Sequence, residues 1–183
     1  MRREELAHLL RAAAKIVNDS EILVVGSQAI LGSYREEDLP EVAWLSVEAD
    51  LAFFDPERGE QKANQVDGAI GELSQFHETY RYYAPGVDLY TAKLPDGWEQ
   101  RLVNFKPKSA EPARARCLDK HDLVISKLVA MREKDQEFAV ALLRENLVDL
   151  NVLKARAAGL SCVPPAVRKN VLRWLEGVER RRR

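Results

Sequence analysis

A short apolar run that ends at a glycine places the strongest limit on how this chain can fold. The run Ile22–Val25 is rich in β-branched residues and too short for a helix, and Gly26 and Ser27 follow it directly. This pattern predicts a buried strand followed by a sharp turn. Residues Gln28–Leu31 then predict a short helix, with Ser27 near its N-cap.

The first 116 residues carry several further patterns of strands and helices. Residues 45–54 alternate between apolar and polar side chains, which predicts a second strand with Val47, Ala49 and Leu51 on one face. The other elements expected in this half are an amphipathic helix over 5–17, a helix over about 61–74, and short strands over 79–92 and 101–106.

The character of the sequence changes near Leu118, because apolar residues then recur at a period of about 3.6 residues. This periodicity predicts a helix over about 119–143, a shorter one after Asp149 and a last one after Pro164. The predicted class is therefore α/β (α+β). We expect a single domain over 1–183, with an α/β core at 1–116 and a helical subregion at 117–183.

Charge and cysteine content exclude several classes of protein. The chain has 28 Lys and Arg against 29 Asp and Glu, a net charge of −1, which argues against binding to duplex DNA. Cys117 and Cys162 lie far apart and the histidines are scattered, so neither a disulfide framework nor a zinc site is expected. The sequence shows no signal-peptide pattern and no long apolar run, so we expect a cytoplasmic protein that does not span a membrane.

Two local patterns suit the binding of a phosphate and a metal ion. Gly26 and Ser27 follow a buried strand at a turn, where a glycine lets a ligand approach the backbone closely. Glu48 and Asp50 occupy positions i and i+2 of a predicted strand and therefore point the same way. Two ionised carboxylates so close repel each other, and a divalent cation relieves this repulsion. Taken alone, the first pattern also fits a plain tight turn, and the second fits a solvated strand face.

Together these residues resemble the motif of the DNA polymerase β-like nucleotidyltransferases. In that superfamily an apolar strand leads to Gly-Gly or Gly-Ser and a helix, and a strand with the order acid, apolar, acid, apolar follows. The corresponding segments here are Val24–Ser27 and Glu48–Leu51. The helical segment His121–Asp135 is similar to that of toxin-type (abortive-infection) and uncharacterised bacterial members, where a helix supplies a lysine and then an acid. The resemblance covers about residues 20–150 and implies a small mixed sheet with a helical C-terminal half.

The resemblance also implies a role for individual residues. Glu48 and Asp50 would bind Mg²⁺ or Mn²⁺, and Asp88 is the candidate for a third carboxylate. The longer interval before the acid pair implies an inserted loop over 33–44, and Glu48 stands where aspartate is more usual. The implied site comprises the catalytic acids Glu48, Asp50 and Asp88 and the nucleotide-binding residues Gly26, Ser27, Lys127, Arg132 and Lys134.

Three further features each keep two interpretations. His77 lies beside an aromatic cluster and is either a base-stacking or acid–base group of the site or a packed surface histidine. Asp135 interrupts an apolar stripe and is either a buried acid paired with Arg132 or a member of the site. Arg180–Arg183 either contact RNA phosphates or form a solvated terminus.

The sequence thus predicts a magnesium-dependent nucleotidyltransferase that transfers a nucleoside monophosphate from a nucleoside triphosphate to RNA or protein. The toxin-type resemblance implies a role in a toxin–antitoxin or defence system. The alternative is a catalytically inactive relative that binds nucleotide or a partner protein as a sensor or antitoxin. Because a chain of 183 residues offers no obvious separate acceptor-binding domain, a cognate protein partner or a homodimer is also expected.

Overall fold

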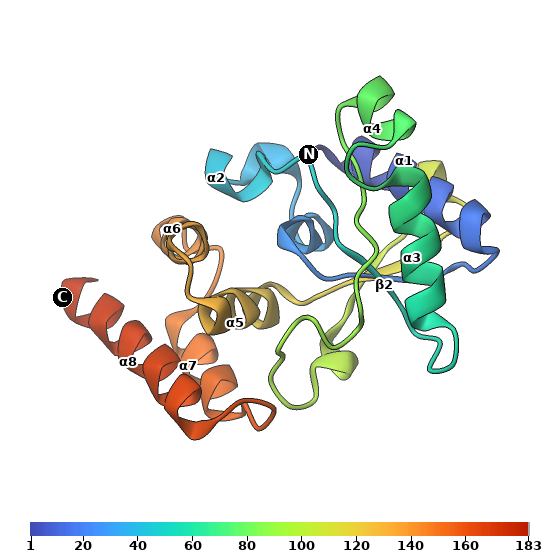
Figure 1. Ribbon diagram of the computed structural model, residues 1–183. Helices are drawn as coiled ribbons and strands as arrows, with labels where there is room; N and C mark the ends of the chain where they lie inside the picture. Colours follow the sequence, from blue (N-terminus) through green and yellow to red (C-terminus); the bar gives the residue numbers. More distant parts are fainter. Residues whose placement is uncertain (183) are drawn as a thin grey trace.

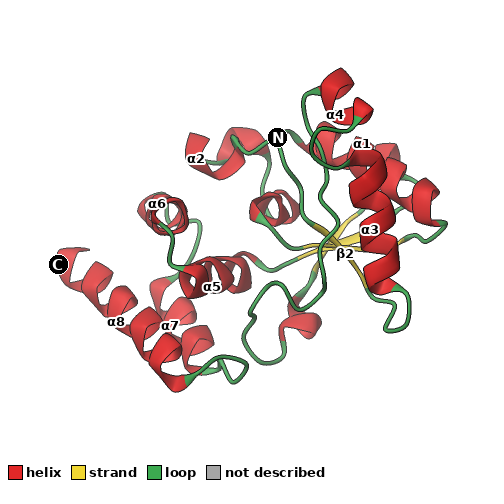
Figure 2. Cartoon of the chain, in the orientation of Figure 1, coloured by secondary structure: helices red, strands yellow, loops and turns green. Residues whose placement is uncertain are grey.

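The computed structural model describes residues 1–182 and contains a four-stranded mixed sheet (Figures 1 and 2). Its strands follow the order β2-β1-β4-β3, where β1 and β4 are parallel and the two outer pairs are antiparallel. The α+β class predicted from the sequence is confirmed. The strands are β1 (Glu21–Val24), β2 (Leu51–Phe53), β3 (Val103–Phe105) and β4 (Arg114–Cys117).

Helices cover the sheet and form the C-terminal part of the chain. α1 packs against α3, and α3 packs against β2. Helices α5 to α8 lie together at the opposite side of the molecule from α1 and α3 (Figure 1). The α-helices are α1 (Arg3–Val17), α2 (Glu41–Trp44), α3 (Gly59–Ile70), α4 (Gln75–Tyr80), α5 (Lys120–Ala130), α6 (Glu133–Arg144), α7 (Leu150–Ala158) and α8 (Pro165–Arg182). The 3₁₀ helices are η1 (Ser27–Gly32), η2 (Glu36–Asp38), η3 (Trp98–Arg101) and η4 (Lys108–Ala110).

Several predicted elements are confirmed at nearly their expected positions. The apolar run Ile22–Val25 lies almost entirely in β1, where Ile22, Leu23 and Val24 are fully buried. The short helix after it is η1, a 3₁₀ helix whose first residue is Ser27. The opening helix, the helix over about 61–74 and the last two helices correspond to α1, α3, α7 and α8. Of the predicted run Arg180–Arg183, the last residue lies outside the part of the chain that the structure describes.

The strand expected over 45–54 is wrong outside β2. α2 ends at Trp44, directly before this region, and Val47 is 47% exposed instead of sharing a buried face with Ala49 and Leu51. The reason is the length of the partner strand, because β1 pairs only with residues 51–53. Residues 48–50 instead run alongside residues 83–86, with Glu48 in an isolated bridge to Tyr83.

The strand expected over 79–92 is also wrong, although 101–106 does contain β3. α4 extends to Tyr80. Beyond it, Tyr83 and Gly86 form isolated β-bridges with Glu48 and Leu51 and no regular strand. Pro85 has no N–H to donate, which limits regular pairing in this segment. β4 was not predicted from the sequence. The positions that alternate with Arg114 and Arg116 hold only small residues, and this makes the strand pattern weak.

The single helix expected over about 119–143 is two helices. α5 ends at Ala130, and the next residue, Met131, has a left-handed backbone conformation with φ of 56° and donates its N–H to the Lys127 carbonyl. α6 then begins after Arg132, which has extended backbone. The break changes the direction of the chain between Lys127 and Arg132, and both residues belong to the predicted site.

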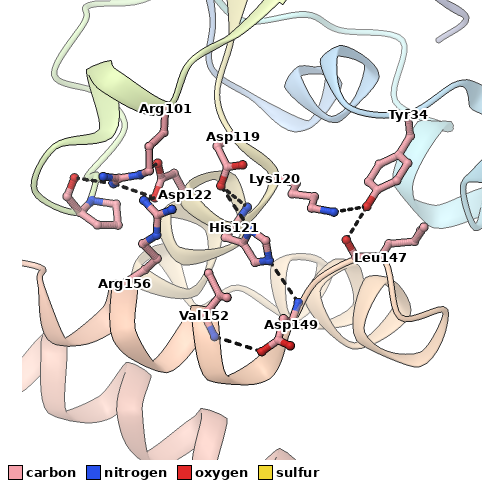
Figure 3. Close-up of polar contacts among 11 residues, drawn as sticks. Tyr34, Arg101, Asp119, Lys120, His121, Asp122, Leu147, Asp149, Val152 and Arg156 are labelled. Carbon is pink, nitrogen blue, oxygen red and sulfur yellow. Dashed lines mark hydrogen bonds and ion pairs between the residues drawn. The ribbon is translucent and has the colours of Figure 1, made fainter.

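A buried carboxylate joins the helical part to the sheet part (Figure 3). Asp122, on α5, accepts hydrogen bonds from Arg101 Nε at 2.8 Å and from Arg156 Nη1 at 3.3 Å. Burial raises the pKa of Asp122 to about 6, and the hydrogen bond from Arg101 opposes this rise. The same carboxylate therefore ties η3, α5 and α7 together. No helix in the described part of the chain combines the length and apolar character needed to cross a membrane.

Candidate functional site

A pocket of about 590 Å³ lies between the turn after β1, the segment before β2, and the helices α5 and α6. Seven of the ten residues predicted for the site line it, although they come from separate parts of the sequence. The other three, Asp88, His77 and Asp135, are not among its lining residues. The seven that line the pocket are Gly26, Ser27, Glu48, Asp50, Lys127, Arg132 and Lys134.

Gly26 provides the space that Asp50 occupies. A Cβ atom built on Gly26 would lie 1.5 Å from Asp50 Oδ2, so no other residue fits here unless the carboxylate moves. The φ angle of Gly26 is −72°, which any residue adopts, so the requirement comes from close approach and not from backbone conformation. Val25 N also donates to the Asp50 carbonyl at 3.0 Å, and this bond holds the turn after β1 against residues 48–50.

The acid pair faces the pocket without a bonded cation of its own. Burial raises the pKa of Asp50, and the nearby charge of Glu48 raises it further. Lys127 and Arg132 are close enough to oppose this rise. Among residues 1–182, none of the ion pairs includes Glu48 or Asp50. Ionising both carboxylates is therefore costly until a cation binds between or beside them.

Asp135 holds two of the cations that line the pocket. It is fully buried and accepts from Arg132 Nε at 2.7 Å and from Lys127 Nζ at 3.2 Å. Burial alone would raise the pKa of Asp135, but these two partners outweigh it and lower the pKa. Its contacts therefore match the interpretation as a buried paired acid, and it fixes the two side chains from behind. Burial lowers the pKa of Lys127, an effect that Asp135 opposes.

Asp88 lies near the pocket but outside it. Its side chain is exposed, and its Oδ1 accepts the N–H of Tyr90 at 2.7 Å. Its neighbours Val87 and Thr91 do line the pocket. In the part of the chain that the structure describes, no group of three acidic, histidine or cysteine side chains is arranged to hold a metal ion. The pocket therefore offers two carboxylates.

Two carboxylates still fit the chemistry of magnesium. Mg²⁺ is commonly bound through one or two carboxylates together with phosphate oxygens of a substrate and water. Glu48 and Asp50 supply that number of protein ligands, and Lys127 and Arg132 supply positive charge for the remaining phosphate oxygens. The donor set is thus suited to a metal shared with a phosphorylated ligand.

Tyr83 is a site residue that the sequence-based prediction missed. Its hydroxyl donates a hydrogen bond to Glu48 Oε2 at 3.0 Å. Burial and this hydrogen bond raise the pKa of Tyr83 to about 12, so the hydroxyl keeps its proton at neutral pH. The ring of His77 packs on the ring of Tyr83 with a centroid distance of 4.4 Å, so His77 contacts a partner of Glu48 and does not itself line the pocket. The one signal in the sequence was the aromatic cluster around His77.

The fold and the pocket define a small α+β protein in which two half-buried acids and several cations line one cavity beside strand β1. The chain belongs to the family described as nucleotidyltransferase of unknown function (DUF6036), whose model matches residues 4–176. No curated protein and no solved structure matches the chain. Membership of a nucleotidyltransferase family agrees with the motif in Gly26, Ser27, Glu48 and Asp50, while the polymerase β-like branch and the toxin-type similarity stay predictions.

Proposed function

We propose that this protein is a magnesium-dependent nucleotidyltransferase that transfers a nucleoside monophosphate from a nucleoside triphosphate to an RNA or protein acceptor, with Mn²⁺ able to replace Mg²⁺. One observation carries the proposal: Glu48 and Asp50 line the same pocket as Lys127 and Arg132. Such a pocket meets the two needs of a metal–triphosphate complex, which are anionic ligands for the metal and cations for the phosphates. The family supports the same class of reaction.

Each group in the pocket has a separate task in this proposal. Gly26 and Ser27 contact the triphosphate, while Lys127, Arg132 and Lys134 neutralise charge that develops on its oxygens. Glu48 and Asp50 would hold the metal, which supplies stabilisation of the attacking and leaving oxygens when bound. An acceptor oxygen forms a bond to the α-phosphorus, the bond from that phosphorus to pyrophosphate breaks, and the acceptor proton leaves to water.

A second candidate function follows from the position of Asp88. Because that carboxylate lies outside the pocket, the cavity lacks the third acid that would orient or deprotonate an acceptor. A protein that binds nucleotide and metal without transferring anything would need only the two acids. In this alternative the protein acts as a nucleotide sensor, or as an antitoxin that binds a partner protein.

Labelled nucleoside triphosphates separate the two candidates. The purified protein is incubated with each labelled triphosphate and Mg²⁺ or Mn²⁺, alone and with total RNA or total protein, and the label in each fraction is measured. Transfer that depends on the metal and is lost in Asp50→Asn is expected. Metal-dependent nucleotide binding without transfer under any condition would support the second candidate. Absence of both binding and transfer would exclude the transferase and the nucleotide sensor, and would leave the antitoxin that binds a partner protein.

We further propose that the protein acts with a partner, as part of a toxin–antitoxin or defence pair or as a homodimer. The similarity of His121–Asp135 to toxin-type members supports this proposal. Light scattering after size exclusion measures the mass of the protein alone and after co-expression with genomic neighbours. A strictly monomeric species in every case would contradict it.

A further inference from the structure

Glu48 is held at its tip by a tyrosine from another segment of the chain. Tyr83 is only 9% exposed, and its hydroxyl lies 3.0 Å from Glu48 Oε2. A carboxylate has about four lone-pair positions on two oxygens. The hydrogen bond therefore occupies part of Oε2 and leaves Oε1 available to a ligand in the pocket.

The hydroxyl is fixed from both its backbone and its ring. Tyr83 N donates to the Val47 carbonyl and Ala49 N donates to the Tyr83 carbonyl, each at 3.0 Å, so the two segments are bonded on both sides of Glu48. The ring packs on His77 with a centroid distance of 4.4 Å. His77 is itself held by the hydrogen bond that its Nδ1 accepts from Leu73 N at 3.1 Å. These contacts hold the Tyr83 hydroxyl in a single position beside Glu48.

We propose that Tyr83 is a positioning residue that orients the Glu48 carboxylate for metal binding, a role that rests on the proposed function. Hydrogen bonds from groups behind a metal ligand fix the direction of that ligand and raise its affinity for the ion. Glutamate has one more rotatable bond than aspartate, so a free Glu48 would lose more side-chain freedom when it binds a metal. The bond to Tyr83 removes that freedom before the metal arrives.

The length of the Glu48 side chain is part of this arrangement. An aspartate at this position would be shorter by one methylene group, and its oxygens would retreat from the Tyr83 hydroxyl. Glu48 and Tyr83 thus form a matched pair, in which the longer acid spans the distance between two extended segments. The pairing predicts that the effects of the two side chains on metal affinity are strongly coupled.

Tyr83→Phe and the matched control Tyr82→Phe test the proposal. Both changes remove one bonded hydroxyl, but that of Tyr82 contacts His8 Nδ1 at 2.8 Å and not the acid pair. The measurement is Mn²⁺ affinity by electron paramagnetic resonance, without and with a nucleoside triphosphate, and thermal unfolding checks that each variant is folded. Tyr83→Phe should weaken Mn²⁺ binding about 10- to 100-fold, the usual effect of losing a group behind a ligand, and Tyr82→Phe should leave it unchanged.

A double-mutant cycle with Glu48→Asp makes the test specific. If Tyr83 acts through the longer acid, Tyr83→Phe should cause little further loss of Mn²⁺ affinity in the Glu48→Asp background. Equal Mn²⁺ affinity in wild type and a folded Tyr83→Phe variant would overturn the role of Tyr83 while leaving the proposed function intact. Failure of the wild-type protein to bind Mn²⁺ with or without nucleotide would overturn both.

Discussion

Two pairs of acids, one near each end of strand β2, differ in their charged partners. Near its C-terminal end, Asp55 and Asp19, the second of which precedes β1, both accept from Lys62 Nζ, each at 2.7 Å. Before its N-terminal end, Glu48 and Asp50 face the pocket, and no ion pair among residues 1–182 includes them. Lys62 neutralises the first pair, whereas the second pair has no bonded cation in the described part of the chain.

The pKa values of the two pairs show the same contrast. The hydrogen bond from Lys62 lowers the pKa of Asp55 to about 2, so this acid is ionised at low energetic cost. Burial raises the pKa of Asp50, with a further contribution from the charge of Glu48. A paired acid contributes to the fold, whereas a buried acid without a paired cation costs folding free energy that a bound metal recovers. The comparison therefore separates a pair of acids with a structural cation from a pair that faces a pocket.

Asp50→Asn should have the largest effect on function, and it tests the pair of acids that faces the pocket. Removing a direct metal ligand should weaken Mg²⁺-dependent nucleotide binding by more than about 100-fold, beyond the usual effect of an outer-shell group. The melting temperature should stay equal or rise, because a buried charge is removed. Calorimetric titration with nucleoside triphosphate and Mg²⁺ measures the affinity. The control is Asp55→Asn at the other end, which should lower the melting temperature and leave nucleotide affinity unchanged. Unchanged affinity in Asp50→Asn would count heavily against the proposed site.

Gly26→Ala should disrupt the same end by displacing Asp50 without removing it. The new Cβ would lie 1.5 Å from Asp50 Oδ2, so the carboxylate must move and metal-dependent nucleotide binding should fall at least about 10-fold. Gly68→Ala is the matched control, because a Cβ at Gly68 meets nothing within 4 Å. That control should stabilise α3 by up to about 1 kcal/mol and leave binding unchanged. Equal loss of binding in both variants would indicate that the effect of Gly26→Ala is not steric.

Lys62→Met tests the other end and should have the smallest effect on function. It leaves Asp19 and Asp55 without their shared cation, so the melting temperature should fall while nucleotide affinity stays unchanged. Because the folded pKa of Asp55 is about 2 and lies below its ordinary 3.8, its bond to Lys62 stabilises the fold above that range. This stabilisation is lost as the pH falls from 3.8 to about 2.

Unfolding followed at a series of acidic pH values measures this contribution. The wild-type protein should lose stability through that range more steeply than Lys62→Met does. Identical pH dependence in the two proteins would show that Lys62 does not set the pKa of Asp55.

Short-range patterns predicted the charged residues and the turn that line the pocket, whereas contacts between distant segments were not predictable. Gly26, Ser27, Glu48 and Asp50 belong to local motifs, and all four line the cavity. Tyr83 has no such motif, since its role arises only when its segment lies beside Glu48.

The same distinction explains the errors in the predicted fold. β4 has a weak strand pattern of its own and is defined by pairing with β1. The break at Met131 falls within an unbroken helical period, because apolar spacing does not register a single left-handed residue. Asp88 follows a strand-like pattern, but the segment around it forms no regular strand and leaves it exposed.

The parallel pairing of β1 with β4 has a consequence for the order in which the protein folds. Ile22 aligns with Ala115 and Val24 with Cys117, so the central pair of the sheet joins segments far apart in the chain. Closing so long a loop costs chain entropy before any contact repays it, which slows folding. During synthesis β1 is made early, and β2 is the first strand that it can pair with. Its parallel partner β4 is made much later. The acid pair is therefore synthesised before Lys127 and Arg132, and the pocket can be completed only after α5 and α6 have been made.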